Sequence, residues 1–398
     1  MNKVKIGEIT DSCLGKMLDA AKNKGEYSPY LANANVRWGS FDLSDLPLMR
    51  FEAHEQDRYG LKYGDLVMCE GGEPVRCAIW KDEIPNMKIQ KALHRIRPHD
   101  GVDVYWLYYW FLACGQRHLL DRFFIETTIK HLPGDRLKDI ELDLPPYDEQ
   151  KSIGAVLSSL DEKINLNKRI CAELEAMAKT LYDYWFVQFD FPDENGKPYR
   201  TSGGTMEWCQ ELGREVPKGW KTTTIGDITI CHDSERIPLS DNQRQEIFGE
   251  IPYYGATGMM GSVNRAIFDG DYVLMAEDGS VMDQQGHPIL QRIHHPCWIN
   301  NHAHVLEPKA DYSCMLVYML LKDIPVVKIK TGSIQMKINQ ANMNAYHIID
   351  IPEPLRLKAN DFLSHIDKQI DKINTENHEL SKLRDWLLPM LMNGQAII

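Results

Sequence analysis

The stretch "DLPPYDEQKSIGAVLSSLDEKINL" (residues 143–166) decides the fold, because part of it returns roughly two hundred residues later in the chain. The segment "LSSLDEKI" (157–164) is matched by "LSHIDKQI" (363–370). Four other segment pairs keep the same order: "KIGEIT" (5–10) with "TIGDIT" (224–229), "YGDLVM" (63–68) with "DGDYVL" (269–274), "IQKALHRIRP" (89–98) with "INNHAHVLEP" (299–308), and "DIELDLPP" (139–146) with "HIIDIPEP" (347–354). Chance matches would not stay collinear, so the chain consists of two similar half-molecules.

Each half ends in a long helix whose apolar residues alternate three and four positions apart, which is typical of a heptad seam. The helices are expected to begin near Gln150 and Pro354. Because each is polar outside its seam, we expect the two to pack on each other as an antiparallel coiled coil. Two amphipathic helices docked separately on their own modules are the alternative. The predicted interface residues are Leu157, Leu160, Ile164, Leu174, Leu181, Leu363, Ile366, Ile370, Ile373, Leu380 and Leu387.

A globular module precedes the helix in each half. Short β-rich runs such as "DYVLMA" (271–276) alternate with turn signals, and one apolar helix is expected near residues 104–115 and 314–323. The sequence therefore predicts a mixed α/β fold of the α+β class, with two tandem modules in a pseudo-twofold arrangement. The predicted divisions are a first module at 1–146, a helix at 147–186, an ordered linker at 187–221, a second module at 222–352 and a second helix at 353–398.

Composition sets broad limits on the class of protein. The 398 residues are 43% hydrophobic, enough for two or three domains with their own cores. No run of about eighteen apolar residues and no apolar signal core is present, so we expect no membrane association and no export. Nine cysteines without a C-x-x-C pair favour free thiols in the cytoplasm. The net charge of −12 taken alone argues against nucleic-acid binding, although local patches matter more than the sum.

The segment "LPPY" (144–147) nearly matches the acid-Pro-Pro-aromatic tetrad of amino-methyltransferases. The position of the acid is taken by Leu144, however, and Asp143 lies one residue too early. The second copy reads Ile351-Pro352-Glu353-Pro354 and has no such tetrad. We therefore interpret the prolines as a hinge into the helix.

Other catalytic signatures are missing as well. The nearest candidate for a glycine-rich cofactor loop, "YGATGMMG" (254–261), has no acid at ribose distance in a strand-loop-helix frame. The sequence contains no Walker loop, H-E-x-x-H or G-x-S-x-G. A metal site among His294, His295, His302 and His304 is disfavoured because no acid or cysteine completes a set at ligand spacing. We predict no catalytic residue, no metal and no enzymatic activity for this chain.

Two similar modules on a helical spacer suit a partner with two sites at a fixed separation. A helix of about thirty residues is about 45 Å long, and one turn of DNA is about 34 Å. Several longer stretches carry a family resemblance: "YDYWFVQFDFPDENGKPYRTSGGTM" (182–206), "ELGREVPKGW" (211–220), "LPPYDEQKSIGAVLSSLDEKI" (144–164), "LSKLRDWLLPMLMNGQ" (380–395), "IPYYGATGMMGSV" (251–263), "MAEDGS" (275–280) and "WINNHAHVL" (298–306). Over essentially its whole length the chain resembles the specificity subunit of a Type I restriction–modification enzyme. The first module departs in lacking the Pro-Lys-Gly-Trp entry of residues 217–220, and its "YLANANVRWGSFDL" (30–43) is of a different subtype.

The resemblance implies that each module is a target-recognition domain that reads one half of an asymmetric bipartite site in double-stranded DNA. It implies that the paired helices set the spacer and dock two methylation subunits, with two motor-nuclease subunits further out. Adenine-N6 methylation, ATP-driven translocation and cleavage would then belong to those partners. S-adenosylmethionine, ATP and Mg²⁺ are expected in the partner subunits, and no cofactor is expected on this chain.

Candidate DNA contacts come from polar residues in turn-rich segments. Amides can pair with adenine, lysine can meet phosphate or guanine, and glycine permits close backbone approach. The candidates in the second module are Tyr254, Thr257, Gly258, Asn300, Asn301, His302, Ser333, Gln335 and Lys337. Those in the first are Asn33, Asn35, Arg37, Arg76, Lys91, Thr127, Thr128 and Lys130, where Lys91 aligns with Asn301.

Two other classes of protein are open at this point. A stand-alone DNA methyltransferase would need the tetrad and cofactor loop that are missing. A non-catalytic coiled-coil scaffold, or an inactive specificity relic without a DNA-reading role, would account for the helices but not for two large, divergent modules.

Overall fold

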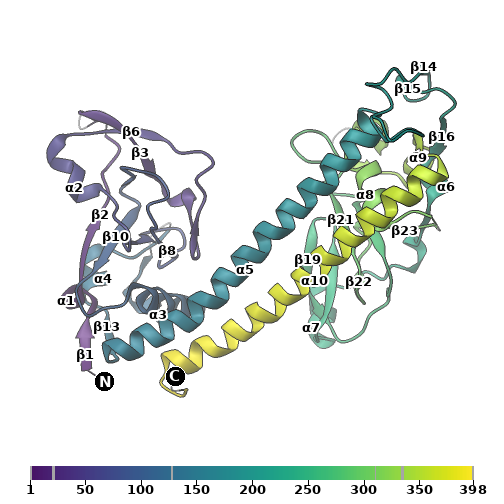
Figure 1. The fold of residues 1–398 in the computed structure, drawn as a ribbon. Helices are drawn as coiled ribbons and strands as arrows, with labels where there is room; N and C mark the ends of the chain where they lie inside the picture. Colours follow the sequence, from purple (N-terminus) through teal and green to yellow (C-terminus); the bar gives the residue numbers. More distant parts are fainter. Residues whose placement is uncertain (1, 20–22, 127–128, 310, 333–335, 397–398) are drawn as a thin grey trace. The chain divides into compact units, whose positions relative to one another are not determined.

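A computed structural model of the chain describes residues 2–19, 23–126, 129–309, 311–332 and 336–396. The chain divides into two compact units, Met1–Leu166 with Asn377–Ile398 and Asn167–Glu376. Two long helices, α5 (Tyr147–Tyr182) and α10 (Glu353–Met392), each contribute one part to each unit (Figure 1). Every unit therefore consists of one globular module and one end of the helix pair.

The module of the first unit is built around a four-stranded antiparallel sheet. Its strand order is β2 (Thr10–Leu14), β10 (Leu93–Pro98), β7 (Leu66–Cys69), β8 (Cys77–Ile79). A second sheet has the order β6 (Leu48–Phe51), β3 (Glu26–Leu31), β9 (Lys88–Ile89), with β3 and β9 parallel. Three strand pairs complete it: β1 (Asn2–Lys5) with β13 (Glu141–Leu144), β4 (Val36–Arg37) with β5 (Ser40–Phe41), and β11 (Ile125–Glu126) with β12 (Lys130–His131). Its helices are α1 (Ile6–Ile9), α2 (Gln56–Tyr59), α3 (Val104–Gln116) and α4 (Gly134–Lys138).

The module of the second unit repeats this plan. Its four-stranded sheet has the order β17 (Thr229–Cys231), β23 (Ala303–Pro308), β20 (Tyr272–Ala276), β21 (Leu290–Ile293). The other sheet is β19 (Gly258–Val263), β18 (Ile251–Gly255), β22 (Trp298–Ile299), with β18 and β22 parallel. The strand pairs are β16 (Lys221–Thr224) with β26 (His347–Asp350), and β24 (Lys330–Thr331) with β25 (Lys337–Ile338). Its helices are α6 (Ile225–Ile228), α7 (Asp241–Glu246), α8 (Cys314–Leu321) and α9 (Gln340–Asn344).

The repeat extends to single hydrogen bonds at the entry of each module. The Thr10 hydroxyl donates to Ile6 O at 2.8 Å, and the Thr229 hydroxyl donates to Ile225 O at the same distance. In both modules the threonine lies one residue after a one-turn helix and begins the first strand of the large sheet. The predicted fold class, two tandem mixed modules each followed by a long helix, is confirmed.

Apolar composition explains why α3 and α8 lie at the centre of their modules. Eight residues of α3 and seven of α8 are buried, and an N-terminal side chain caps each helix. Asp103 accepts from Trp106 N at 2.8 Å, and Ser313 accepts from Leu316 N at 3.1 Å. Each capped helix packs against the large sheet and against the long helices, so it links the two layers.

The Pro145-Pro146 pair is the hinge that the sequence predicts. Strand β13 ends at Leu144 and α5 begins at Tyr147, so the prolines lie between the two elements. Gln150, which is almost fully buried, donates to Pro145 O at 2.9 Å and accepts from Asp103 N at 2.9 Å. These bonds fasten the first turn of α5 to the start of α3.

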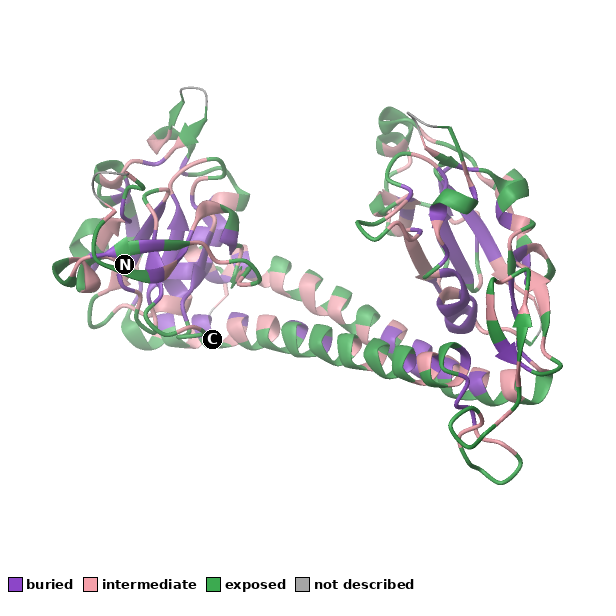
Figure 2. Ribbon diagram, turned by 90° about the horizontal axis from the view of Figure 1, so that it is seen from above, coloured by how far each residue is buried: buried purple, intermediate pink, exposed green. Residues whose placement is uncertain are grey.

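The long helices run antiparallel to each other within the second unit. Asn167 Nδ2 donates to Glu376 Oε2 at 2.8 Å, and Cys171 Sγ lies 3.8 Å from Asn374 Oδ1, so partners fall in number along α10 as they rise along α5. In the first unit, Arg384 Nη1 pairs with Asp161 Oδ1 at 2.7 Å. Both helices alternate buried and exposed turns (Figure 2).

Every predicted interface residue is at least partly withdrawn from solvent. Buried are Leu157, Ile164, Leu363, Ile366 and Ile370. Half-buried are Leu160, Leu174, Leu181, Ile373, Leu380 and Leu387. The spacing of three and four residues thus selects the protected face of each helix.

The C-terminal part of α10 departs from a simple two-helix seam. Leu388 and Leu391 are fully or almost fully buried, whereas Leu387, which the heptad spacing selects, is only half-buried. Both leucines belong to the core of the first module together with Trp106 of α3. The buried face is wider here because α10 packs on a module as well as on α5.

A π-helical turn at Asp183–Val187 ends the first long helix and leads into the segment between the modules. Phe191 stacks on Tyr199 and on Trp220, with ring centroids 4.8 and 5.2 Å apart. Strands β14 (Met206–Cys209) and β15 (Arg214–Pro217) form a hairpin in this segment. The aromatic side chains of this segment belong to the core of the second unit, so the segment packs on that unit.

All nine cysteines lie in the described part of the chain, and none of them is in a disulfide. Among the described residues, no helix combines the length and the apolar character that crossing a membrane requires.

We predict that Leu388→Ala lowers the free energy of unfolding of the first unit by about 2–5 kcal/mol, because it leaves a cavity in a closed core. Leu383→Ala, on the same helix but exposed, should change it by less than about 0.5 kcal/mol. Urea unfolding combined with hydrogen exchange of the first module measures both. Equal effects of the two variants would contradict the packing of α10 on this module.

Candidate nucleic-acid interface

In the second module, four segments that are distant in sequence meet at one margin of the sheets. We define the second polar edge as the β18–β19 turn (255–258), the β22–β23 turn (300–302), the end of β20 (277–278) and the β24–β25 hairpin, of which residues 330–332 and 336–338 are described. Parallel pairing of β18 with β22 brings the first two segments together, because both strands end on the same side. Most candidate residues of this module lie on this edge.

Hydrogen bonds and a β-bridge join the four segments one after another. Asn300 N donates to Tyr254 O at 3.0 Å, which links the β22 end to the β18 end. His302 Nδ1 lies 2.6 Å from Asp278 Oδ1, which links the β22–β23 turn to β20. Asp278 in turn forms a β-bridge with Lys337 of the hairpin. The edge is therefore one continuous surface.

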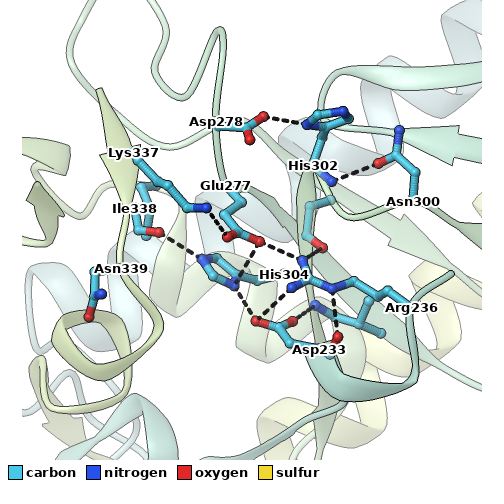
Figure 3. Close-up of polar contacts among 12 residues, drawn as sticks. Asp233, Arg236, Glu277, Asp278, Asn300, His302, His304, Lys337, Ile338 and Asn339 are labelled. Atoms are coloured by element: carbon cyan, nitrogen blue, oxygen red, sulfur yellow. Dashed lines mark hydrogen bonds and ion pairs between the residues drawn. The ribbon is translucent and has the colours of Figure 1, made fainter. Parts of the chain in front are cut away.

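A charged network lies directly beneath this edge (Figure 3). Arg236 Nη1 donates to Glu277 Oε2 at 2.6 Å, and Arg236 Nη2 lies 3.5 Å from Asp233 Oδ2. His304 Nδ1 lies 2.5 Å from Asp233 Oδ2. Lys337 Nζ pairs with Glu277 Oε1 at 2.8 Å. Two carboxylates thus meet three basic side chains in a nearly closed environment.

The ring of His304 has an acceptor at each nitrogen. Nδ1 faces the Asp233 carboxylate, and Nε2 lies 3.1 Å from Ile338 O. A carboxylate and a carbonyl can only accept, so both contacts are hydrogen bonds when the ring carries a proton on each nitrogen. The ring thereby ties β23 to the β25 strand of the hairpin.

The network stabilises the ionised forms of its carboxyl groups. Burial acts to raise the pKa of Asp233, but the hydrogen bond and charge of His304 outweigh it, and the pKa is lowered. The pKa of Glu277 is also lowered, because hydrogen bonds from Lys337 and Arg236 overcome the effect of burial. The hydrogen bond to Glu277 raises the pKa of Lys337. The polar edge therefore rests on fixed charges.

The candidates of the second module fall into two groups. Asn301, His302, Thr257 and Lys337 are exposed, with His302 48% and Lys337 52% accessible at the side chain. Asn300 is buried, and its Oδ1 accepts from His302 N at 2.8 Å. The expected role of Asn300 is therefore revised: it shapes the turn that presents its neighbours.

The turn between β18 and β19 forms another part of this edge. Gly258 has φ +147°, a value that favours glycine, and added side-chain atoms there would meet no neighbour. Tyr254 is half-buried with its hydroxyl 3.0 Å from His295 Nε2, and burial raises the pKa of Tyr254 to about 12. Gln291 donates to Gly255 O at 3.0 Å and so holds the base of the turn. Ser333 and Gln335 lie outside the described residues.

The first module contains the same frame at the same place. His94 Nε2 lies 2.8 Å from Leu132 O, and Leu132 N donates to Glu70 O at 2.7 Å. The same two contacts join the corresponding residues of the second module. Counting along the paired strands β2 and β17, Leu14 stands where the second module has Asp233. The frame is shared, whereas the acid that binds the histidine is present in the second module alone.

This replacement changes the electrostatics beneath the first edge. Burial lowers the pKa of His94, which lacks a carboxylate partner among the described residues. Burial raises the pKa of Glu70, against the opposing charges of His131 and Lys91. The first module therefore favours the uncharged forms of His94 and Glu70, whereas the second favours the ionised form of Glu277.

We define the first polar edge as residues 33–37, 70–76, 90–91 and the described parts of the β11–β12 hairpin. Lys91 follows β9 as Asn301 follows β22, and Lys91, Lys130 and Arg37 are exposed. Lys130 lies 3.3 Å from Glu126, and Arg37 lies 3.7 Å from Asp42. Thr127 and Thr128 lie outside the described residues.

Three other candidates of the first module hold its loops together. Asn35 is buried and donates to Asp42 O at 2.9 Å and to Asp45 O at 3.2 Å. Asn33 donates to Gly71 O at 2.8 Å and accepts from Arg76 Nη2 at 3.0 Å. The expected role of the buried Asn35 is therefore revised from contact to positioning, whereas Asn33 and Arg76 are half-buried and their DNA contacts stay predictions.

The sequence interpretation missed Asp233 and Arg236 altogether. Both lie in the segment "CHDSER" (231–236), which shows no motif and no periodicity. Glu277 lies in "MAEDGS", which was noted for its family resemblance and not as part of an ion-pair network. The environment of Arg236 is found from the fold, because Glu277 and Ala303 O, two of its partners, come from segments distant in sequence, whereas Asp233 lies three residues before it.

Comparison with known proteins agrees with this geometry. A family model described as "Type I restriction modification DNA specificity domain" matches residues 1–176 and 217–382. The chain belongs to this family. The two matched stretches are the two halves of the repeat, each with a module and most of the long helix that follows it.

Two specificity subunits are similar to this family member in sequence. The Type I restriction enzyme MjaIX specificity subunit of Methanocaldococcus jannaschii is 25% identical over 327 residues, which are 77% of this chain and 72% of the relative. The HindI specificity subunit of Haemophilus influenzae is 22% identical over 334 residues, 67% of this chain and 72% of the relative. The solved S subunit of a type I restriction-modification system from M. genitalium matches with a TM-score of 0.56 and 17% identity, covering 98% of this chain and 95% of that one. This last match supports the fold.

We predict that Arg236→Gln lowers the free energy of unfolding of the second unit by about 3–5 kcal/mol, since it leaves two nearly buried carboxylates without their shared partner. Lys337→Gln removes an exposed member of the same network and should cost less than about 1 kcal/mol. Denaturant unfolding at neutral pH measures both. A small effect of Arg236→Gln would show that the network contributes little to the module.

Proposed function

We propose that this chain is the DNA sequence-recognition subunit of a Type I restriction–modification complex, and that its two polar edges read the two halves of an asymmetric bipartite target. One observation carries the proposal: the same fold margin is built twice, with one shared frame and two different sets of exposed side chains. The chain belongs to a family of DNA specificity domains, so DNA is the ligand that we expect these edges to bind. Two polar edges with the same side chains would suit a symmetric target. The two edges of this chain carry different side chains, so they suit an asymmetric one.

The exposed groups on each edge have the chemistry that duplex DNA requires. Asn301 can form a bidentate pair with adenine, and Lys91 or Lys337 can meet phosphate or guanine. Gly258 permits close approach of the backbone at the tip of the β18–β19 turn. The edges project loops and hairpins, which can follow the contour of a groove.

The net charge of −12 is compatible with this role because binding depends on the local field. Acidic residues beneath the second edge are already paired with Arg236, His304 and Lys337. Subunits that join the complex can supply further positive charge around the duplex.

We further propose that the paired helices dock two methylation subunits, with two motor-nuclease subunits bound through the complex. Exposed apolar side chains on α5 and α10 support this assembly role, since isolated helices in water rarely present so many. They are Tyr147, Leu166, Ile170, Met177, Leu357, Phe362, Leu383 and Trp386. On this proposal S-adenosylmethionine, ATP and Mg²⁺ act in the partner subunits, this chain performs no chemistry, and the complex works in the cytoplasm.

The direct test is modified-base sequencing of DNA from cells that co-express this chain with its methylation subunit. We expect methyladenine confined to one split motif that depends on the chain. Replacing residues 1–146 by the matching module of another family member should change one half of the motif and leave the other half unchanged. Stable complex formation without new modification would contradict the proposed function.

Single lysines give a finer prediction. In the assembled complex, Lys337→Gln should lower affinity for the target and reduce the slope of log affinity against log salt by about 1, because one phosphate contact is lost. Lys221→Gln, an exposed lysine outside both polar edges, is the matched control and should leave the slope unchanged. Fluorescence anisotropy across a salt series measures both slopes. Equal slopes for wild type and Lys337→Gln would exclude a phosphate contact by this lysine.

A further inference from the structure

A second buried cluster lies where the second module meets its helix pair, away from the polar edge. His294 directly follows β21, Cys314 is the first residue of α8, and Asp367 lies on α10. The ring nitrogen, the thiol sulfur and a carboxylate oxygen of these residues all lie within 4.8 Å of one another. Three elements that are far apart in sequence therefore bring one nitrogen, one sulfur and one oxygen donor to a single point.

A neighbouring carboxylate orients His294 in the way that metal-bound histidines are usually oriented. His294 Nδ1 lies 2.7 Å from Asp271 Oδ1, so this carboxylate holds the proton of Nδ1 and turns Nε2 toward the cluster. Nε2 lies 3.2 Å from Asp367 Oδ2 but, among the described residues, it meets no partner in hydrogen-bond geometry. A carboxylate behind the second nitrogen is the usual arrangement around a metal-bound histidine.

The two carboxylate oxygens of Asp367 face different partners. Arg292 Nε lies 2.8 Å from Asp367 Oδ1, and its guanidinium also reaches Glu175 of α5 at 3.0 Å. This leaves Asp367 Oδ2 facing His294 and Cys314. Asp367 is 4% exposed and Cys314 is 5% exposed, so these two donors are screened from bulk water, while His294 is half-buried.

A cavity of about 580 Å³ opens beside the three donors. Its lining includes the carboxylates of Asp271, Glu307 and Asp371 in addition to the cluster itself. The cavity offers an entry path for a cation and room for a water molecule as fourth ligand. Its lining also includes Lys368, but carboxylates outnumber this lysine, so the cavity favours positive charge.

We propose that His294 Nε2, Cys314 Sγ and Asp367 Oδ2 bind a Zn²⁺ ion that fastens the second module to α10. One nitrogen, one thiolate and one carboxylate suit zinc, which takes these donors at about 2.0–2.3 Å in tetrahedral geometry. A thiolate donor disfavours Mg²⁺ and Ca²⁺, which prefer oxygen. The sequence predicted no metal here because the acid and the cysteine are remote from His294 in sequence, and the fold supplies both.

Binding requires proton release. In the structure the Cys314 thiol donates to Tyr272 O at 3.3 Å, and this proton leaves when sulfur bonds to the metal. A proton on His294 Nε2 leaves as well, while the proton on Nδ1 stays on the ring and is donated to Asp271 Oδ1 in a hydrogen bond. The ion would replace these protons and draw the three donors together.

Two other donor sets in the described residues fit a metal less well. Cys231, Asp233 and His304 also lie close together, but Arg236 already occupies the space between the acids and both nitrogens of His304 have acceptors. The third set lies on a surface loop at residues 52–55, where its Glu55 pairs with Lys16 at 2.5 Å.

The test uses the purified full chain, stripped with a chelator and titrated with Co²⁺ and with Zn²⁺. We expect one Co²⁺ per chain with the absorption of thiolate-to-cobalt charge transfer, displacement of that signal by Zn²⁺, and a higher unfolding temperature when Zn²⁺ is bound. Cys314→Ser should abolish the charge-transfer band. Asp367→Asn should weaken Co²⁺ binding at least tenfold, as loss of one ligand does.

Two cysteine variants serve as controls. Cys297→Ser removes a thiol of the same module that is equally buried and outside the cluster, and should retain the band. Cys231→Ser tests the rival set and should also retain it. Absence of stoichiometric Co²⁺ binding in the wild-type chain, or loss of the band in Cys231→Ser but not in Cys314→Ser, would overturn the proposal. If Cys314→Ser fails to fold, the Asp367→Asn variant decides. An unchanged affinity of this variant for Co²⁺ would also overturn the proposal.

Discussion

Pairing of α5 with α10 is the interaction on which the rest of the structure depends. Each of these helices is polar over most of its surface, and helical propensity alone does not hold such a helix in water. Each module also needs them, because the core of the first contains Leu157 and Leu388 and the core of the second contains Ala178 and Leu363. A module therefore completes its core with side chains from both ends of the repeat. Such long-range contacts make folding of either module depend on most of the chain.

The two halves of the repeat share the elements of the frame and differ in the side chains of the polar edges. The entry helix, the large sheet, the capped central helix and the histidine contact to the last hairpin occur in both modules. These elements determine where the polar edges form. The charges on and beneath the edges differ, and Leu14 in the first module stands at the position that Asp233 takes in the second. A duplicated frame with independent margins is the simplest way to give one chain two specificities.

The sequence correctly predicted the features that follow from repeated or periodic patterns. Collinear segments revealed the repeat, and heptad spacing selected helix positions that the structure withdraws from solvent, such as Leu157 and Ile370. The prediction of contact residues failed where polar residues of the same type differ only in their surroundings. Asn300 and Asn301 are neighbours of the same type, yet the first is buried as a turn-forming acceptor and the second is exposed. Periodicity reports burial of apolar faces, and it carries no information on which polar side chain finds a backbone partner.

Networks assembled from several segments are the other feature that sequence could not supply. Glu277, which pairs with Arg236, and Asp367, which lies beside His294, are remote from these residues in sequence, so no spacing rule connects them. Both sets become visible once the sheet order is known. A search by fold position, with the repeat as a guide, is therefore more informative for such sites than a search by motif.

The network beneath the second edge also bears on selectivity, if that edge reads DNA as proposed. Lys337 is held by Glu277, which is itself held by Arg236, so the ammonium group is already ordered before any ligand arrives. A free lysine would lose about 2 kcal/mol of side-chain entropy on contact, and this one loses less. A phosphate must, however, compete with Glu277 for the same charge. Attraction to an arbitrary backbone is thereby reduced, and a larger share of the binding free energy has to come from contacts that distinguish one base from another.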